Sequence, residues 1–286
     1  MLIVAGKGGV GKTTISAAIA RAAARSGFRV LVAAVDVGSP LGELLGRDGP
    51  ISAVQPVDCG GGVWAQLVTP AQSLDEYLDG HGLGLVSRAM ARSGVLDIVA
   101  TAAPGIDDIV VLGKLKALER AAGHDGPYDL VVVDAPAAGH AVTFLRSPRA
   151  LSSMIRVGPI ATQAREAAEL LGDGARCRVV LVTLAEETPV NEAIETAFAL
   201  EDELGLTLGP IVVNGLYPDL VGLDVPSRGT DAIKAAARFR LTRSANQHEQ
   251  LARLAAALPL PQRAVPFIFS AGLGPADIDT LADALC

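Results

Sequence analysis

The chain begins with the apolar run LIVA at residues 2–5, which leads into the glycine-rich stretch GKGGVGKTT at residues 6–14. This stretch fits the pattern G-x-x-x-x-G-K-[ST], in which the backbone N–H groups of a tight loop turn inward around phosphate oxygens. An Ala-rich helical pattern opens at Thr13, so the loop precedes a helix N-terminus, whose positive end favours anions. A strand, this loop and a helix in that order predict an α/β fold built on a parallel sheet.

The loop residues have distinct predicted roles. Lys12 is expected to reach the β- and γ-phosphates of ATP, and the Thr13 hydroxyl is expected to hold Mg²⁺. The predicted nucleotide-binding residues of this loop are Gly8, Gly9, Val10, Gly11, Lys12, Thr13 and Thr14.

A second lysine, Lys7, stands in the same loop. A second cation aimed at the same oxygens from the same chain would be crowded beside Lys12. A lysine that projects outward can instead neutralise phosphate charge on a facing protomer, as an arginine finger does in trans. The two lysines therefore predict a catalytic role for both and a dimer with two facing sites.

Apolar runs rich in β-branched residues recur along the chain. Because they lack strict alternation, they fit strands buried on both faces. Together with the Ala-rich helical patterns between them, they predict a mostly parallel, twisted sheet of about seven strands with helices on both faces. The runs start at Leu2, Arg29, Gly62, Tyr128, Arg178, Gly209 and Arg263.

Two stretches interrupt this alternation with helical patterns and no convincing strand, about residues 70–123 and 146–175. We expect them to form a helical subdomain inserted into a single domain that spans residues 1–286. Residues 215–231 are the most loop-like part of the chain, because they are rich in Gly, Pro and Asp.

The composition narrows the possible function classes. The net charge of −7 and the aromatic content of 3% argue against a broad nucleic-acid surface, which needs clustered cations and exposed rings. The three cysteines form no C-x-x-C pair, so a zinc or redox motif is not supported. Neither a signal peptide nor an apolar run of membrane-spanning length is visible, which predicts a soluble, cytoplasmic protein without an integral membrane segment.

Two aspartates stand at the carboxyl ends of predicted strands. Asp36 follows the second run, and Asp134 follows the run LVVV. Ligands of open parallel sheets bind at this edge, and a carboxylate there can hold Mg²⁺ directly or through water. For each aspartate alone, a helix cap or a turn is the alternative.

Several motifs resemble those of the ArsA-like ATPases, which include the arsenite-pump ATPase and the targeting factor for tail-anchored membrane proteins. GKGGVGKTT resembles the deviant Walker A loop, whose extra lysine acts across a dimer. DAPAAGH at residues 134–140 is similar to the family's switch II motif D-T-A-P-T-G-H, and PGIDD at residues 104–108 is similar to P-G-I-D-E. VVNGLYP at residues 212–218 resembles the family's V-V-N-x-x-x-P loop.

The resemblance implies further site residues. It assigns Asn214 to the adenine base, with Pro266 and Phe267 near it. In switch I, Glu43 stands where the family has the aspartate that orients the attacking water. Glutamate can do the same with one more methylene, or Glu43 can be a charge on a helix face. Switch II has alanine at two positions where the family has hydroxyls, which puts the hydrolysis rate in doubt more than ATP binding.

The resemblance predicts an ATP-driven dimeric switch that couples ATP hydrolysis to the binding or release of a client protein. The family's dimer-bridging C-x-x-C zinc site is missing, so both a homodimer and a heterodimer with a paralogue remain open. One alternative is a weakly hydrolysing subunit that pairs with a more active paralogue. Another is a partition ATPase similar to ParA or MinD, which would need a basic surface or a basic C-terminal helix.

Overall fold

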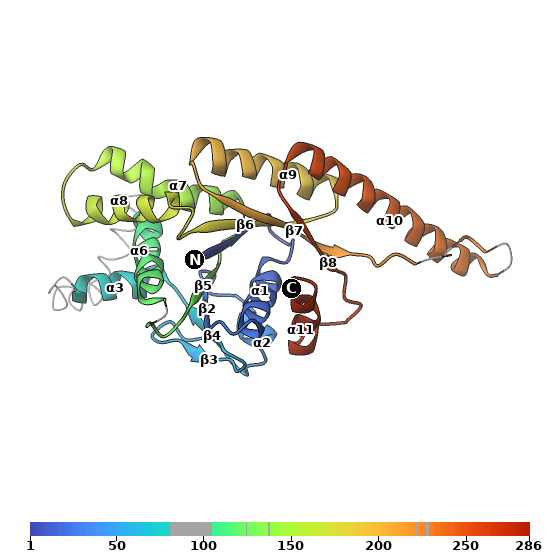
Figure 1. Cartoon of the computed structure of the whole chain (residues 1–286), viewed down its shortest axis with the longest axis horizontal. Helices are drawn as coiled ribbons and strands as arrows, with labels where there is room; N and C mark the ends of the chain where they lie inside the picture. The colour runs from blue at the N-terminus through green and yellow to red at the C-terminus, as the bar shows by residue number, and fades with distance from the viewer. Residues whose placement is uncertain (81–104, 124, 137, 221, 223, 227–228) are drawn as a thin grey trace.

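The computed structural model describes the chain except residues 81–104, 124, 137, 221, 223 and 227–228. Its centre is an eight-stranded sheet with the order β3-β4-β2-β5-β1-β6-β7-β8 (Figure 1). All neighbouring strands are parallel except β3 and β4. The strands are β1 (Leu2–Ala5), β2 (Val30–Ala34), β3 (Val57–Asp58), β4 (Val63–Leu67), β5 (Leu130–Asp134), β6 (Arg178–Leu184), β7 (Leu208–Leu216) and β8 (Gln262–Pro266).

The predicted fold class is confirmed, and each of the seven predicted strands is present. The eighth strand, β3, is a two-residue piece paired antiparallel to β4 at the sheet edge. The central strands are buried on both faces, which explains their unbroken apolar runs. In β5, Val131 and Val133 enter one core cluster, and Val132 enters the other.

Helices cover both faces of the sheet. The first core cluster holds side chains of α6, α7, α8, α9 and α10, and the second holds side chains of α1, α2 and α11. The helical elements are α1 (Lys12–Arg25), α2 (Leu41–Leu44), α3 (Pro70–Gly80), α6 (Ile106–Ala121), α7 (Ala138–Met154), α8 (Pro159–Gly172), α9 (Glu187–Phe198), the π-helical turn η1 (Ala199–Glu203), α10 (Asp231–Ala257) and α11 (Pro275–Asp283).

Helices α3, α6, α7 and α8 pack against one another at one end of the molecule (Figure 1). Lys116 of α6 is 5% exposed and forms an ion pair with Glu166 of α8, which joins these two helices. Three of them lie in the ranges expected for the helical subdomain, but α7 begins at Ala138, well before residue 146. Residues 81–104 of that expected subdomain lie outside the described part of the chain.

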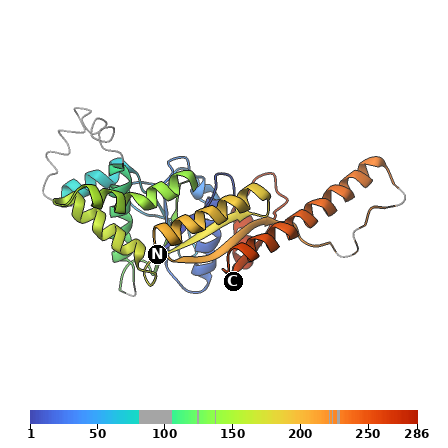
Figure 2. The ribbon, with the colours of Figure 1, turned by 90° about the horizontal axis from the view of Figure 1, so that it is seen from above.

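Helix α10 has 27 residues, and its first half extends beyond the rest of the molecule (Figure 2). It starts at Asp231, the last residue of the region predicted to be a loop, and the Thr230 hydroxyl caps it by accepting a hydrogen bond from the Ile233 N–H. No helix in the described part of the chain is long and apolar enough to cross a membrane.

Candidate phosphate-binding site

The parallel sheet brings the predicted site residues to one edge. The carboxyl ends of parallel strands share an edge, so the segments that follow β1, β2, β5, β7 and β8 lie next to one another. The loop at residues 6–11 follows β1, Asp36 follows β2, and Asp134 ends β5. Asn214 lies near the end of β7, and Leu216 of the same strand pairs with Pro266, the last residue of β8.

The conformation of the loop explains its glycines. Gly9 and Gly11 have φ values of 86° and 88°, in the left-handed region that disfavours other residues. A Cβ atom on Gly11 would lie 2.4 Å from Nδ2 of Asn214, and one on Gly6 would lie 2.3 Å from the carbonyl oxygen of Val182. The loop therefore lies directly against β6 and β7, and its backbone fits only without side chains at these positions.

Lys12 and Lys7 of this loop have different partners. The half-buried Lys12 donates a hydrogen bond through Nζ to the Lys7 carbonyl at 3.3 Å. Burial lowers the pKa of Lys12, while Asp134 and Asp36 act in the opposite direction. Nζ of Lys7 instead donates to Oε1 of Glu192 on α9, in an ion pair whose side chains are both 36% exposed. Glu192 was not predicted, because nothing local in the sequence links residues 185 positions apart.

Asp134 accepts hydrogen bonds from three hydroxyl groups. Thr13 donates to its Oδ2 at 2.7 Å, Ser16 donates to Oδ1 at 3.3 Å, and Ser39 donates to Oδ2 at 3.4 Å. The carboxylate is 3% exposed, and this burial raises its pKa, while the hydroxyls and nearby Lys12 favour the charged form. Ser16 was not predicted, although its position one turn after Thr13 on α1 is a signal that could have identified it.

The oxygen atoms around Asp134 suit a hard cation. Carboxylate and hydroxyl oxygens are the ligands that Mg²⁺ prefers, so Thr13 and Asp134 fit the predicted metal site. Asp36 is exposed, and its Oδ1 accepts a hydrogen bond from the Gly38 N–H at 3.0 Å. Asp36 thus forms an Asx turn and also contributes negative charge near Lys12.

Glu43 is exposed on the short helix α2, between the buried residues Gly42 and Leu44. Within the described part of the chain, its carboxylate forms no hydrogen bond or ion pair. Its role in orienting water therefore stays a prediction, beside the alternative of a charge on a helix face.

The residues expected near adenine are close to one another and to the loop. Nδ2 of Asn214 donates to the Val10 carbonyl at 2.9 Å, and the Phe267 N–H donates to the Leu216 carbonyl at 2.8 Å. The ring of Phe267 is 41% exposed and lies edge-on to the ring of Tyr217, with a centroid distance of 5.0 Å.

Sequence reasoning missed the rest of this aromatic cluster. Phe269 packs on both Tyr217 and Phe267, and the guanidinium of Arg240 lies 4.3 Å from the centre of the Tyr217 ring. The motif VVNGLYP contains Tyr217, but the partners of its ring come from the segment after β8 and from α10, far along the chain.

Comparison with known proteins gives consistent matches. Residues 1–160 match the family of anion-transporting ATPases (ArsA_ATPase). The chain is 35% identical over 224 residues to the ATPase BagA of Mycobacterium tuberculosis, an alignment that covers 76% of this chain and 65% of that protein. It is 29% identical over 235 residues to an arsenical pump-driving ATPase of Escherichia coli, covering 76% of this chain and 39% of the relative. The chain thus spans less than two thirds of the length of these relatives.

Proposed function

Because this chain belongs to the anion-transporting ATPase family, we propose that it binds ATP with Mg²⁺ at residues 6–14 and hydrolyses it to ADP and phosphate. The hydrogen bond between Thr13 and the buried Asp134 carries this proposal, since it joins the start of α1, directly after the loop, to the carboxylate at the end of β5. Lys12 and the loop N–H groups would bind the phosphates. Asn214, Pro266 and Phe267 would contact the base.

Thr13 and Asp134, with Asp36 nearby, would hold Mg²⁺. The ion would neutralise charge on the phosphate oxygens. Ser16 and Ser39 would keep the Asp134 carboxylate oriented, because both donate hydrogen bonds to it. Glu43 is the candidate for orienting the attacking water, and its exposed position on α2 leaves it accessible from solvent.

The active form is proposed to be a dimer in which Lys7 reaches the phosphates bound by a facing protomer. In one chain Lys7 pairs with Glu192, so dimer closure would exchange this partner for phosphate oxygens. The helices α3, α6, α7 and α8, as an inserted subdomain of a single domain, would convert closure into the binding or release of a client protein. The site of action is proposed to be the cytoplasm, where unpaired cysteines stay reduced.

A second candidate function is a slowly hydrolysing subunit that pairs with a more active paralogue. Two observations favour it. The Glu43 carboxylate has no hydrogen-bonding partner in the described part of the chain, and switch II has Ala135 and Ala138 where the related motif has hydroxyls.

ATP turnover per protomer, measured over a range of protein concentrations, separates these functions. For a homodimer, turnover per protomer rises with concentration, and Lys7→Ala abolishes it while ATP still binds. Lys234→Ala is the matched control, because it removes a lysine on the distant α10. Glu43→Gln abolishes turnover if Glu43 orients water. Negligible turnover at every concentration, with ATP bound, would refute the homodimeric enzyme and direct the search to a partner chain.

Glu192→Gln tests the exchange of partners by Lys7. A partly exposed ion pair contributes about 0.2–1 kcal/mol, so its removal should lower the protein concentration at half-maximal turnover by about 1.5- to 5-fold. Glu195→Gln on the same helix is the control, since Glu195 is exposed and has no ion pair within the described residues. Loss of turnover in Glu192→Gln would instead place Glu192 in the closed catalytic arrangement.

A further inference from the structure

A cavity lies at the amino-terminal ends of the parallel strands, whereas the phosphate loop lies at their carboxyl ends. Its volume is about 420 Å³, within the usual range for small-molecule sites. Its walls are the amino-terminal parts of β1, β5, β6, β7 and β8, one side of α1, and the last two residues of the chain. On α1, Ile19, Ala22 and Ala23 face it, which are positions i, i+3 and i+4 of one helix face. Leu2 and Val180 contribute apolar surface from the sheet.

The charged side chains that line this cavity are two arginines, Arg178 from the start of β6 and Arg263 from β8. Both are exposed, and in the described part of the chain neither forms an ion pair. Arg178 donates a hydrogen bond through Nε to the Gly174 carbonyl, which leaves its terminal nitrogens without a bonded anion among these residues. Cys286, the last residue of the chain, also lines the cavity, and its terminal carboxylate forms no ion pair with either arginine among the described residues. The cavity thus combines an apolar interior with two arginines and one terminal carboxylate, so its lining carries a net positive charge.

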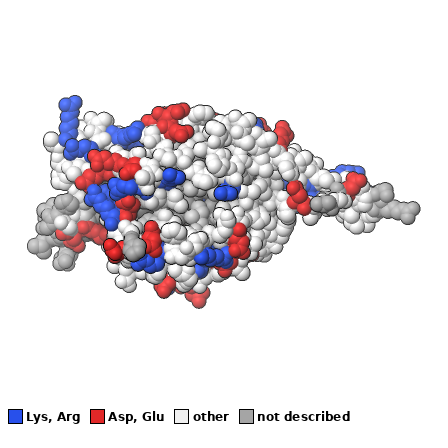
Figure 3. All heavy atoms as spheres, viewed as in Figure 1, with Lys and Arg blue, Asp and Glu red and all other residues white. Residues whose placement is uncertain are grey.

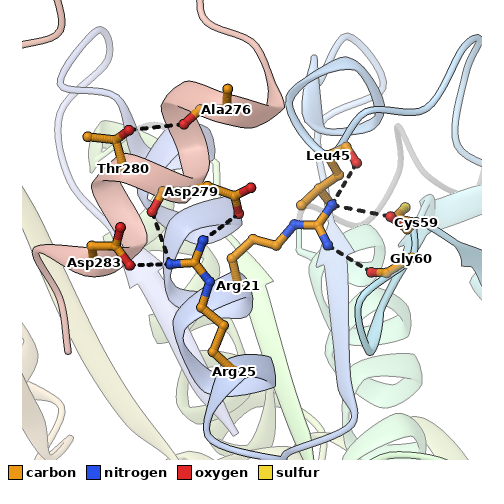
Figure 4. Close-up of polar contacts among 9 residues, drawn as sticks. All are labelled: Arg21, Arg25, Leu45, Cys59, Gly60, Ala276, Asp279, Thr280 and Asp283. Atoms are coloured by element: carbon orange, nitrogen blue, oxygen red, sulfur yellow. Dashed lines mark hydrogen bonds and ion pairs between the residues drawn. The ribbon is translucent and has the colours of Figure 1, made fainter.

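The neighbouring acidic side chains do not pair with these two arginines. Figure 3 shows the face that carries both chain termini, and its middle is largely uncharged, with isolated basic groups. Acidic and basic side chains gather together elsewhere on this face, over the α6 and α8 end of the molecule. Two carboxylates of α11, Asp279 and Asp283, both pair with Arg25 of α1 (Figure 4).

The same contacts hold the α1 wall of the cavity in place. Arg25 fastens the last turn of α1 to α11, and Arg21 donates to the carbonyls of Leu45, Cys59 and Gly60 (Figure 4). The cavity is therefore already formed in the free chain, and a ligand need not open it. A pre-formed apolar cavity binds an apolar body with little cost of ordering protein groups.

We propose that this cavity binds a small amphipathic carboxylate, with its apolar body against α1 and the sheet and its anionic head paired with Arg178 or Arg263. Guanidinium groups match the geometry of carboxylates and form strong, charge-assisted hydrogen bonds with them. An apolar ligand without charge would leave both arginines unused, and a cationic ligand would meet two arginines against a single terminal carboxylate. The site is independent of the ATP site, since the phosphate loop lies at the opposite edge of the sheet.

Isothermal titration calorimetry of the full chain with decanoate tests the proposal, with 1-decanol as the uncharged comparison. We expect decanoate to bind at one site per chain and about tenfold or more tightly than 1-decanol. The double substitution Arg178→Gln and Arg263→Gln should weaken decanoate by at least the same factor and leave 1-decanol unchanged. Arg156→Gln is the control, an exposed arginine that does not line the cavity.

A second variant distinguishes the cavity from binding elsewhere on the surface. Ala23→Leu adds volume on the cavity side of α1 without disfavouring the helix, so it should abolish decanoate binding while the melting temperature is maintained. Equal binding of decanoate and 1-decanol would overturn the role of the arginines. Undiminished decanoate binding by Ala23→Leu, or no binding by the native chain, would overturn the site itself.

Discussion

Replacing Gly11 with alanine tests the geometry of the phosphate loop. Gly11 has a φ of 88° and a ψ of 32°, and a left-handed conformation costs an ordinary residue about 1–2 kcal/mol. The new Cβ would also lie 2.4 Å from Nδ2 of Asn214, which must then leave the Val10 carbonyl. The lost hydrogen bond adds about 1 kcal/mol. We expect the free energy of unfolding to fall by about 2–3 kcal/mol, measured by urea denaturation.

Gly9→Ala is the matched control for this prediction. Gly9 has nearly the same φ, 86°, but a Cβ there would have no neighbouring atom within 4 Å. Only the cost of the left-handed backbone conformation remains, so Gly9→Ala should lower the free energy of unfolding by about 1–2 kcal/mol. In an Asn214→Ala background, which removes the obstructing amide, Gly11→Ala should cost no more than Gly9→Ala. Equal destabilisation by both substitutions in the native background would refute the close packing of Asn214 on the loop.

Three further predictions follow from individual titratable side chains. Asp134→Asn should weaken Mg²⁺-dependent ATP binding at least tenfold, measured by titration with a fluorescent ATP analogue. The same substitution should not lower the free energy of unfolding, because burial already disfavours the charged carboxylate. Burial raises the pKa of Cys177 to about 12, so iodoacetamide at about pH 8.5 should alkylate the exposed Cys286 well before Cys177, and equal rates by mass spectrometry would contradict this. The hydrogen bond from Lys116 lowers the pKa of Glu166. This interaction therefore stabilises the fold at neutral pH, and its stabilisation is lost as the pH falls through the lowered pKa. The free energy of unfolding of Glu166→Gln, measured during acid unfolding, should depend less on pH in this range than that of the native chain.

The fold was predictable where burial alone decides the sequence pattern. β5 has an apolar run because its residues are buried on both faces, and the same holds for β2. The two-residue strand β3 has no such pattern, since it pairs only at the sheet edge. Helix α10 was not delimited because its first half is largely exposed and mixes Ala with charged residues, so no apolar stripe marks it.

The candidate site was predictable where one local stretch of chain forms it. The loop glycines and Lys12 follow from a motif that a single β–loop–α unit imposes. The hydrogen bonds of Asp134 with Ser16 and Ser39 join residues 118 and 95 positions apart, and no short-range pattern encodes them. What the sequence does not reveal is thus mainly the tertiary packing that positions the motifs.

Lys7 illustrates how a tertiary contact changes the interpretation of a sequence motif. Its pairing with Glu192 gives the lysine a partner in its own chain, which at first argues against a role in another protomer. The strength of this ion pair leaves that role possible, because a partly exposed pair of this kind contributes no more than about 1 kcal/mol. The phosphates of ATP carry several negative charges, and charge-assisted hydrogen bonds to phosphate oxygens are stronger than neutral ones. We therefore propose that Glu192 is a weak resting partner of Lys7, which the phosphates of a facing nucleotide would displace.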